Sequence, residues 1–171
     1  DKAEKETGEQ KMYMANITAE TDVMKKRAAH IKKYGGEYFM IDILTVGWSG
    51  VQTMRNQNEK LKMFIHAHRA MHAALTRNPR HGIAMLPIAK CARLIGVDQL
   101  HIGTAAVGKM HGSSTEELDV EHEMEFPAFH PKFSYSLLDQ EWHNLKPVLA
   151  VASGGLHAGM TEKLVKIMGK N

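Results

Sequence analysis

Five short stretches of the chain are rich in apolar and β-branched residues and are too short to be read as helices. They predict β-strands over residues 11–18, 37–44, 63–68, 98–104 and 147–153. Between and after them, apolar residues recur at the three- and four-residue spacing of an amphipathic helix. These segments predict helices over residues 21–36, 49–62, 70–77, 83–96, 115–126 and 158–169.

Strands that alternate with helices and are apolar on both faces are typical of parallel βαβ units, and therefore of an α/β fold. Each of the last three predicted strands ends in a polar tip, "HAHR", "HIGT" or "VASGG". A (β/α)8 TIM barrel builds its site from the carboxyl ends of successive strands, whereas an open doubly wound sheet concentrates ligands at one switch point. We therefore expect a partial barrel of about five consecutive βα units, without its early and last strands.

The composition is that of one globular domain, with a mild net charge of +3. Basic residues are scattered and rarely alternate with aromatics, which gives little support to nucleic-acid binding. No apolar run approaches the roughly 20 residues of a membrane span, and no signal-like segment opens the chain. The only cysteine is Cys91, which excludes an internal disulfide and fits a cytoplasmic location. The chain begins with Asp1 rather than Met, so we expect it to be a piece of a longer protein.

The tip "HAHR" and the residues after it place His66, His68, Arg69 and His72 within seven positions. Because side chains alternate along a strand, His66 and His68 share one face. Two imidazoles could bind a metal with ligands from other strands, or could serve a phosphate held by the arginine, as donors or proton carriers. For His68 and Arg69, at the strand end, we favour a functional role over a structural one. For His66 and His72 a structural role fits equally well.

The two later tips extend the anion interpretation. His101 precedes a glycine-containing loop that carries Lys109, which fits a lid that brings a cation over an anion, or an ordinary solvated loop. Ser153, Gly154 and Gly155 end the fifth strand, where glycines allow an oxyanion to approach backbone N–H groups or simply allow a tight turn. Elsewhere we expect the acidic helix 115–126 to be a solvated face and most methionines to fill the core. Trp48 and Trp142 have no predicted role.

Taken together and in this order, "HAHRAMHA", "HIGT…VGKM" and "VASGG" resemble the large subunit of RuBisCO, ribulose bisphosphate carboxylase/oxygenase. The stretch "LDQEWHNLKPVLAVASGGLHAGM" is similar to the archaeal form III or II/III branch, and the likeness covers residues 7–171. The resemblance implies that His68 transfers protons and that Lys109 stabilises the incoming carboxylate. It implies that Arg69 and His101 bind one substrate phosphate, and that Ser153, Gly154 and Gly155 bind substrate near the other phosphate.

The same resemblance implies that the chain is part of the C-terminal catalytic barrel domain, over residues 1–171. In the family, Mg²⁺ is held by a carbamylated lysine and two carboxylates of a K-x-D-E motif that is absent here, so we expect no metal ligand in this chain. The implied partners are ribulose bisphosphate, CO₂, O₂ and a second subunit of a homodimer or a larger oligomer, with no nucleic acid or membrane. We expect the isolated chain to be inactive.

Three alternatives compete with a carboxylase. A RuBisCO-like protein would enolise or isomerise another phosphorylated sugar, although the joint presence of His68, Arg69, His101, Lys109 and Ser153 argues against it. A metal-dependent hydrolase of the amidohydrolase kind also has H-x-H on a strand, but on its first strand, and here at least two strand units precede the motif. A binding module without enzymatic activity would have no affinity for bisphosphates.

Overall fold

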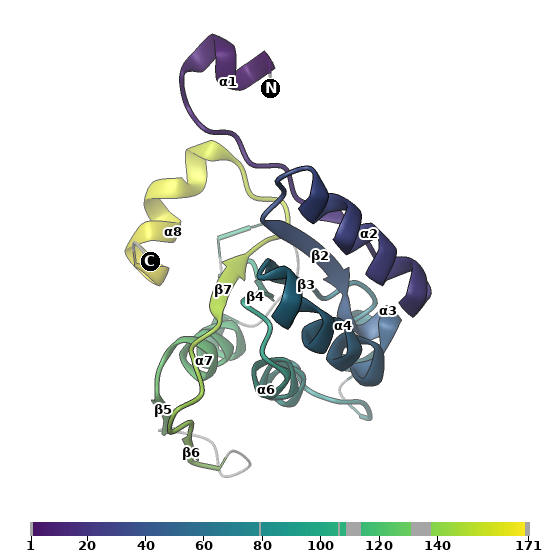
Figure 1. Cartoon of the computed structure of the whole chain (residues 1–171). Helices are drawn as coiled ribbons and strands as arrows, with labels where there is room; N and C mark the ends of the chain where they lie inside the picture. The colour runs from purple at the N-terminus through teal and green to yellow at the C-terminus, as the bar shows by residue number, and fades with distance from the viewer. Residues whose placement is uncertain (1, 79, 106, 109–113, 131–137, 170–171) are drawn as a thin grey trace.

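The centre of the computed structural model is a five-stranded sheet in the order β1-β2-β3-β4-β7 (Figure 1). The structure describes residues 2–78, 80–105, 107–108, 114–130 and 138–169. Every pair of neighbouring strands in this sheet is parallel. The strands are β1 (Ala15–Asn16), β2 (Tyr38–Asp42), β3 (Phe64–His68), β4 (Gln99–Gly103) and β7 (Leu149–Ala152). The five predicted strands and the α/β class are therefore confirmed.

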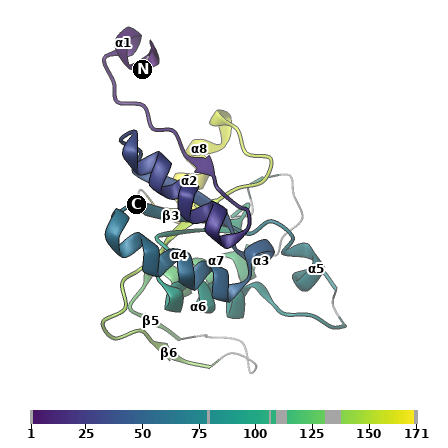
Figure 2. The ribbon, with the colours of Figure 1, turned by 45° about the vertical axis from the view of Figure 1, so that its right-hand side comes forward.

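Helices follow the strands and pack beside one another in chain order, as they do around the outside of a barrel (Figure 2). Helix α2 contacts α4, α4 contacts α6, and α6 contacts α7. The helices that match the prediction are α2 (Thr21–Lys33), α4 (Trp48–Leu61), α5 (Ala73–Thr76), α6 (Met85–Ile95), α7 (Ser114–Glu125) and α8 (Thr161–Met168), with the 3₁₀ helix η1 (Ala158–Met160) before α8. Parallel strands backed by helices in this order form one section of a (β/α)8 wall, as the sequence predicted.

Some short elements were not predicted. They are helix α1 (Lys2–Thr7), helix α3 (Ile43–Val46) and an antiparallel pair of strands, β5 (Ala128–Phe129) and β6 (Gln140–Glu141). The strand predicted to reach residue 44 ends at Asp42, because α3 begins directly after it. This early end leaves the Asp42 side chain at the carboxyl end of β2.

The core lies between the sheet and the helices that cover it. Strands β3 and β4 contribute Ile65, Ala67, Leu100 and Ile102, all without exposed surface. These four side chains lie on one face of the sheet, whereas the opposite face is mostly half-buried, with His66 as a buried exception. Of the methionines that the structure describes, five are buried and fill gaps in the core, which is fewer than the prediction of most; they are Met24, Met54, Met63, Met85 and Met124. Met12 and Met71 are exposed exceptions.

The prediction of a solvated acidic face on α7 is wrong. Glu117, Glu121 and Glu123 expose only 6%, 5% and 0% of their surface. All three lie on α7, which packs against α6, β4 and β7. Burial, with a contribution from Glu125, raises the pKa of Glu121 to about 7. These three glutamates of α7 therefore make buried contacts with elements far away in the sequence instead of forming a solvated face.

A buried arginine on α6 explains part of this burial. Arg93 is 1% exposed, and its Nη1 donates to the carbonyl oxygens of Glu123, Met124 and Phe126 at 2.7, 2.8 and 2.9 Å. These are carbonyls at the end of α7, which have no partners within the helix. The guanidinium carbon lies 4.4 Å from the centre of the Trp142 ring, so Trp142 is a buried structural residue. Among the described helices, none is long and apolar enough to cross a membrane.

Candidate functional site

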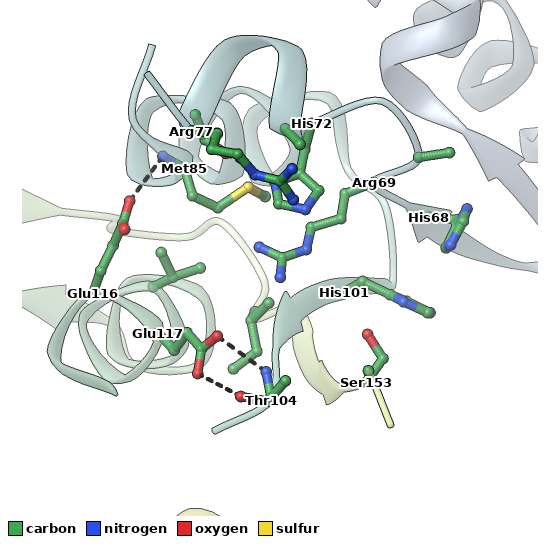
Figure 3. A pocket seen from close by; sticks show the side chains of 16 residues that line it. His68, Arg69, His72, Arg77, Met85, His101, Thr104, Glu116, Glu117 and Ser153 are labelled. Atoms are coloured by element: carbon green, nitrogen blue, oxygen red, sulfur yellow. Dashed lines mark hydrogen bonds between the residues drawn. The ribbon is translucent and has the colours of Figure 1, made fainter. Parts of the chain in front are cut away.

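A cavity of about 930 Å³ opens at the carboxyl ends of β3, β4 and β7 (Figure 3). Polar side chains from several strand ends and from α5 and α7 point into it. Its lining residues are His68, Arg69, Ala70, His72, Ala73, Thr76, Arg77, Met85, His101, Ile102, Thr104, Glu116, Glu117, Val120, Ser153 and Gly154. Two arginines, three histidines and two glutamates are among them, so the cavity holds both hydrogen-bond donors that suit an anion and carboxylates that oppose the arginine charge.

The structure brings most of the predicted site residues to this one cavity. His68, Arg69, His101, Ser153 and Gly154 all line it, although they come from three different strands. Such convergence follows from the parallel sheet, because the carboxyl ends of its strands meet at one edge.

Four candidates remain, of which only His72 is among the residues that line the cavity. Gly155 does not line the cavity but completes the turn beside Gly154. Lys109 lies outside the described residues. His66, 4% exposed, is buried below the cavity, and His72 lines the wall and bonds Thr76 Oγ1 through Nδ1 at 2.9 Å.

His68 is oriented by a carboxylate that the sequence analysis missed. Its Nδ1 lies 2.7 Å from Asp42 Oδ1, and Asp42 is its register partner on β2. Asn16 Nδ2 donates to the same carboxylate oxygen at 3.0 Å, and Thr18 Oγ1 accepts from the Asp42 backbone N–H at 2.8 Å. This network at the ends of β1, β2 and β3 holds one ring nitrogen of His68, so that Nε2 is left for proton transfer.

His101 is in contact with both histidines of β3. Its ring meets the rings of His66 and His68 edge-on, with centroids 4.7 and 4.8 Å apart. Burial, together with electrostatic contributions from His66, His68 and Arg69 and against that of Asp42, lowers the pKa of His101 to about 4. His101 is therefore neutral near pH 7 unless a bound anion changes its surroundings.

Arg69 faces two glutamates of α7 across the cavity. Burial lowers the pKa of its guanidinium, while the charges of Glu117 and Glu116 oppose that change. Glu117 is held in place because its carboxylate accepts from Thr104 N at 3.1 Å and from Thr104 Oγ1 at 3.4 Å. Because the two glutamates oppose the effect of burial, the Arg69 guanidinium stays charged. Its N–H groups can then donate hydrogen bonds to a ligand.

The absence of a side chain at Gly103 leaves room for the Glu117 carboxylate and the Arg69 guanidinium. Its backbone has φ +132°, and a Cβ there would lie 2.1 Å from Glu117 Oε1 and 2.8 Å from Arg69 Nη2. Any side chain at position 103 would therefore displace the carboxylate or the guanidinium. The glycine of the "HIGT" tip has a packing role at the site.

The turn after β7 approaches the cavity with its backbone. Gly154 and Gly155 have φ of +113° and +68°, a region that only glycine adopts readily. Ser153 N donates to Gly103 O at 2.6 Å, which ties this turn to the end of β4. A Cβ at Gly108 would lie 2.2 Å from Gly154 O, so the two segments meet backbone to backbone. Ser153 Oγ points toward His101 in the close view (Figure 3).

Several site residues escaped the sequence analysis: Asp42, Gln99, Thr104, Glu116, Glu117 and Arg77. A register argument finds two of them, because Asp42 pairs with His68 and Gln99 pairs with His66 in adjacent parallel strands. No register argument of this kind identifies Glu116 and Glu117, because they lie on a helix. Within the part of the chain that is described, no group of three or more His, Cys, Asp or Glu side chains is arranged to hold a metal ion.

The chain is similar to known proteins over its whole length. The family model described as ribulose bisphosphate carboxylase large chain, catalytic domain, matches residues 1–171. The ribulose bisphosphate carboxylase of Pyrococcus horikoshii is 50% identical over 100% of this chain and 36% of its own length. That of Methanosarcina mazei is 49% identical over 100% of this chain and 40% of its own length.

Solved structures agree with the sequence comparison. The dimeric archaeal Rubisco from Hyperthermus butylicus superimposes with a TM-score of 0.88 at 45% identity, covering 99% of this chain and 39% of that one. The octameric Rubisco from P. horikoshii, in complex with sulfate ion, gives 0.84 at 48% identity, covering 99% and 36%. The chain thus spans between 36% and 40% of the length of these relatives. It belongs to the ribulose bisphosphate carboxylase large chain family, within the catalytic domain of that family.

Proposed function

We propose that residues 1–171 are part of the C-terminal catalytic barrel domain of a ribulose bisphosphate carboxylase large subunit. The reaction is the addition of CO₂ to ribulose bisphosphate to give two molecules of 3-phosphoglycerate, with O₂ as a competing substrate. The observation that carries the proposal is the convergence of His68, Arg69, His101 and the Ser153–Gly154 turn on one polar cavity. Two phosphates need two separate anion sites, and this cavity offers them on different strands.

The first phosphate site uses Arg69 and His101. Arg69 presents a planar fork of N–H donors, which matches the oxygens of a phosphate. The partly buried setting strengthens each charge-assisted bond relative to the same bond in water. Glu117 and Glu116 oppose the charge of Arg69 across the cavity and so help to fix where the guanidinium lies.

The second phosphate site uses the turn Ser153–Gly155. Two positive-φ glycines in succession leave backbone N–H groups uncovered by side chains, so that an oxyanion can come close. Lys109, which follows β4 in the sequence, would stabilise the carboxylate that forms when CO₂ adds.

Proton transfer is assigned to His68. Its Nδ1 bonds Asp42, which fixes the ring and stabilises the imidazolium that forms when Nε2 takes a proton. The imidazole can then return the proton at a later step of the reaction. Enolisation, hydration and carbon–carbon cleavage each require such a transfer.

The catalytic centre requires more than this chain. Members of the family generally use Mg²⁺. Because the K-x-D-E motif that holds it in the family is absent from the sequence, its ligands would lie on other segments of the complete subunit. The bound ion would polarise the substrate oxygens. A second subunit completes the assembly as a homodimer or a larger oligomer, in the cytoplasm. The chain alone would then bind phosphate without turning over substrate.

The test is a labelled-CO₂ incorporation assay on the complete subunit, meaning this chain with the flanking segments that its relatives carry. Mg²⁺-dependent incorporation that needs Lys109 and Arg69 supports the proposal, and the Lys109→Ala variant should lose carboxylation but keep its fold. Isomerisation of a phosphorylated sugar without CO₂ incorporation would instead assign the chain to the RuBisCO-like alternative. Robust turnover by residues 1–171 alone would contradict the need for further segments.

A further inference from the structure

Three polar side chains form a row beside the cavity, of which His66 is buried and Gln99 and His101 are half-buried. Gln99 Oε1 lies 2.7 Å from His66 Nδ1, and His66 Nε2 lies 2.6 Å from His101 Nε2. Gln99 and His66 are register partners on β4 and β3, and His101 lies two residues beyond Gln99 on the same face. His66, in the middle of the row, is 4% exposed, whereas Gln99 and His101 keep exposed surface, so solvent reaches both ends of the row.

The row leaves one nitrogen of His101 for a ligand. Its Nε2 is engaged by His66, and among the described residues no hydrogen bond is formed by its Nδ1. If His101 contacts an anion in the cavity, the contact is made through Nδ1. A neutral imidazole carries one proton, so Nδ1 is either a donor or an acceptor, but not both.

Two arrangements satisfy the row. In the first, the Gln99 carbonyl accepts from His66 Nδ1–H, His66 Nε2 accepts from His101 Nε2–H, and His101 Nδ1 is an acceptor. In the second, the Gln99 amide N–H donates to His66 Nδ1, His66 Nε2–H donates to His101 Nε2, and His101 Nδ1–H is a donor. The two differ by a rotation of the Gln99 amide and by the tautomers of both rings.

Only the second arrangement suits a phosphate dianion, which accepts hydrogen bonds and repels a lone pair. Burial and the neighbouring positive charges disfavour a doubly protonated His101, because they lower its pKa. Protonating the ring is thus a costly way to obtain a donor at Nδ1. Selecting the other neutral tautomer is the cheaper way.

We propose that Gln99 and His66 are positioning residues that set the tautomer of His101, and that a phosphate dianion in the cavity selects the arrangement in which His101 Nδ1–H donates to it. This inference rests on the proposed function, since it concerns the same phosphate site. The proton count of the row is unchanged. One proton passes from His101 Nε2 to His66 Nε2, His66 Nδ1 releases its proton to water, and His101 Nδ1 takes one from water.

The test is ¹⁵N NMR of the chain labelled at histidine and glutamine, titrated with inorganic phosphate at constant pH. With saturating phosphate, His101 Nδ1 and His66 Nε2 should move to the protonated range, His66 Nδ1 should move to the unprotonated range, and the Gln99 side-chain amide signals should shift. The Arg69→Ala variant, which lacks the main phosphate ligand, should show none of these changes.

A variant of the middle residue separates communication from packing. In His66→Phe, which keeps a buried ring, the Gln99 amide signals should no longer respond to phosphate, and the phosphate dissociation constant should rise about tenfold, the loss of roughly one good hydrogen bond. His122→Phe, on the exposed face of α7, is the matched control and should behave as the parent chain. Should His66→Phe fail to fold, the tautomer measurement on the parent chain still decides the question.

The outcomes separate this inference from the proposed function. Phosphate binding that depends on Arg69 but leaves both ring tautomers unchanged would overturn the relay and keep the phosphate site. Gln99 signals that still respond in His66→Phe would also overturn it. No phosphate binding at all, by NMR or calorimetry, would overturn both.

Discussion

Replacing Gly103 by Ala tests how closely α7 is fitted to the strand ends. The added Cβ would lie 2.1 Å from Glu117 Oε1 and 2.8 Å from Arg69 Nη2, far inside normal contact distance. The carboxylate has to move, and its bond to Thr104 N at 3.1 Å is then lost. A buried hydrogen bond to a charged group contributes about 1.5–3 kcal/mol, and the positive φ adds about 1–3 kcal/mol of backbone strain.

The expected loss in the free energy of unfolding is therefore about 3–6 kcal/mol. Gly35→Ala is the matched control, because Gly35 also has positive φ, +82°, but has nothing within 4 Å of its added Cβ. It should lose only the strain, about 1–3 kcal/mol. Urea denaturation followed by circular dichroism measures both. The Gly103→Ala chain should also bind phosphate more weakly, since Arg69 is displaced.

A double-mutant cycle identifies the cause. In a Glu117→Ala background the carboxylate is gone, so Gly103→Ala should cost no more than about the Gly35→Ala control, with a coupling energy of about 1.5–3 kcal/mol. Equal losses for Gly103→Ala and Gly35→Ala in the parent chain, within about 0.5 kcal/mol, would refute the reasoning. So would a coupling energy near zero.

Four further outcomes follow from the described contacts. Arg69→Lys should weaken phosphate binding about tenfold by calorimetry, because an ammonium cannot form the two parallel bonds of a guanidinium. Asp42→Asn should lower carboxylation by the complete subunit about a hundredfold at unchanged fold, because the imidazolium of His68 loses its counter-charge. The pKa of Glu121 is raised from 4.5 to about 7, so the free energy of unfolding should fall as pH rises between these values. Glu121→Gln should abolish this pH dependence. In urea titrations at pH 8 it should stabilise the chain by about 1–2 kcal/mol. Arg93→Met should cost about 3–5 kcal/mol in the same assay, because carbonyls at the end of α7 lose their donor; a loss below about 1 kcal/mol would contradict that role.

The fold could be predicted because its signals are local. Short apolar runs and helical periodicity follow from the chain's own neighbours, and polar tips at strand ends indicate where parallel strands converge. The strand predicted to reach residue 44 was too long because the turn into α3 at Ile43 leaves no mark in an apolar sequence. Pairs of small elements such as β5 and β6 depend on contacts that only the folded chain supplies.

The site could be predicted only in part. His68, Arg69, His101 and Ser153 were found because they occupy strand tips, whereas their partners are set by register and by packing across the cavity. Asp42 was taken as part of a strand, although its pairing with His68 makes it part of the site.

The acidic helix was misread for a related reason. Frequent glutamates are typical of a solvated face. Here Lys90 from α6 pairs with the buried Glu123 carboxylate, Arg93 donates to the Glu123 backbone carbonyl, and Thr104 from the end of β4 donates to the buried Glu117 carboxylate. None of these three residues is near α7 in the sequence. Buried charge of this kind is invisible to a reading that considers one helix at a time.

The most direct measurement of the central claim is a crystal structure of the complete subunit with a carboxylated bisphosphate analogue. One phosphate should lie within hydrogen-bond distance of Arg69 and His101, and the other should lie against the backbone of Gly154 and Gly155, with His68 near the carbon chain between them. An analogue bound with both phosphates away from these residues, or with only one of the two sites in contact with it, would contradict the account.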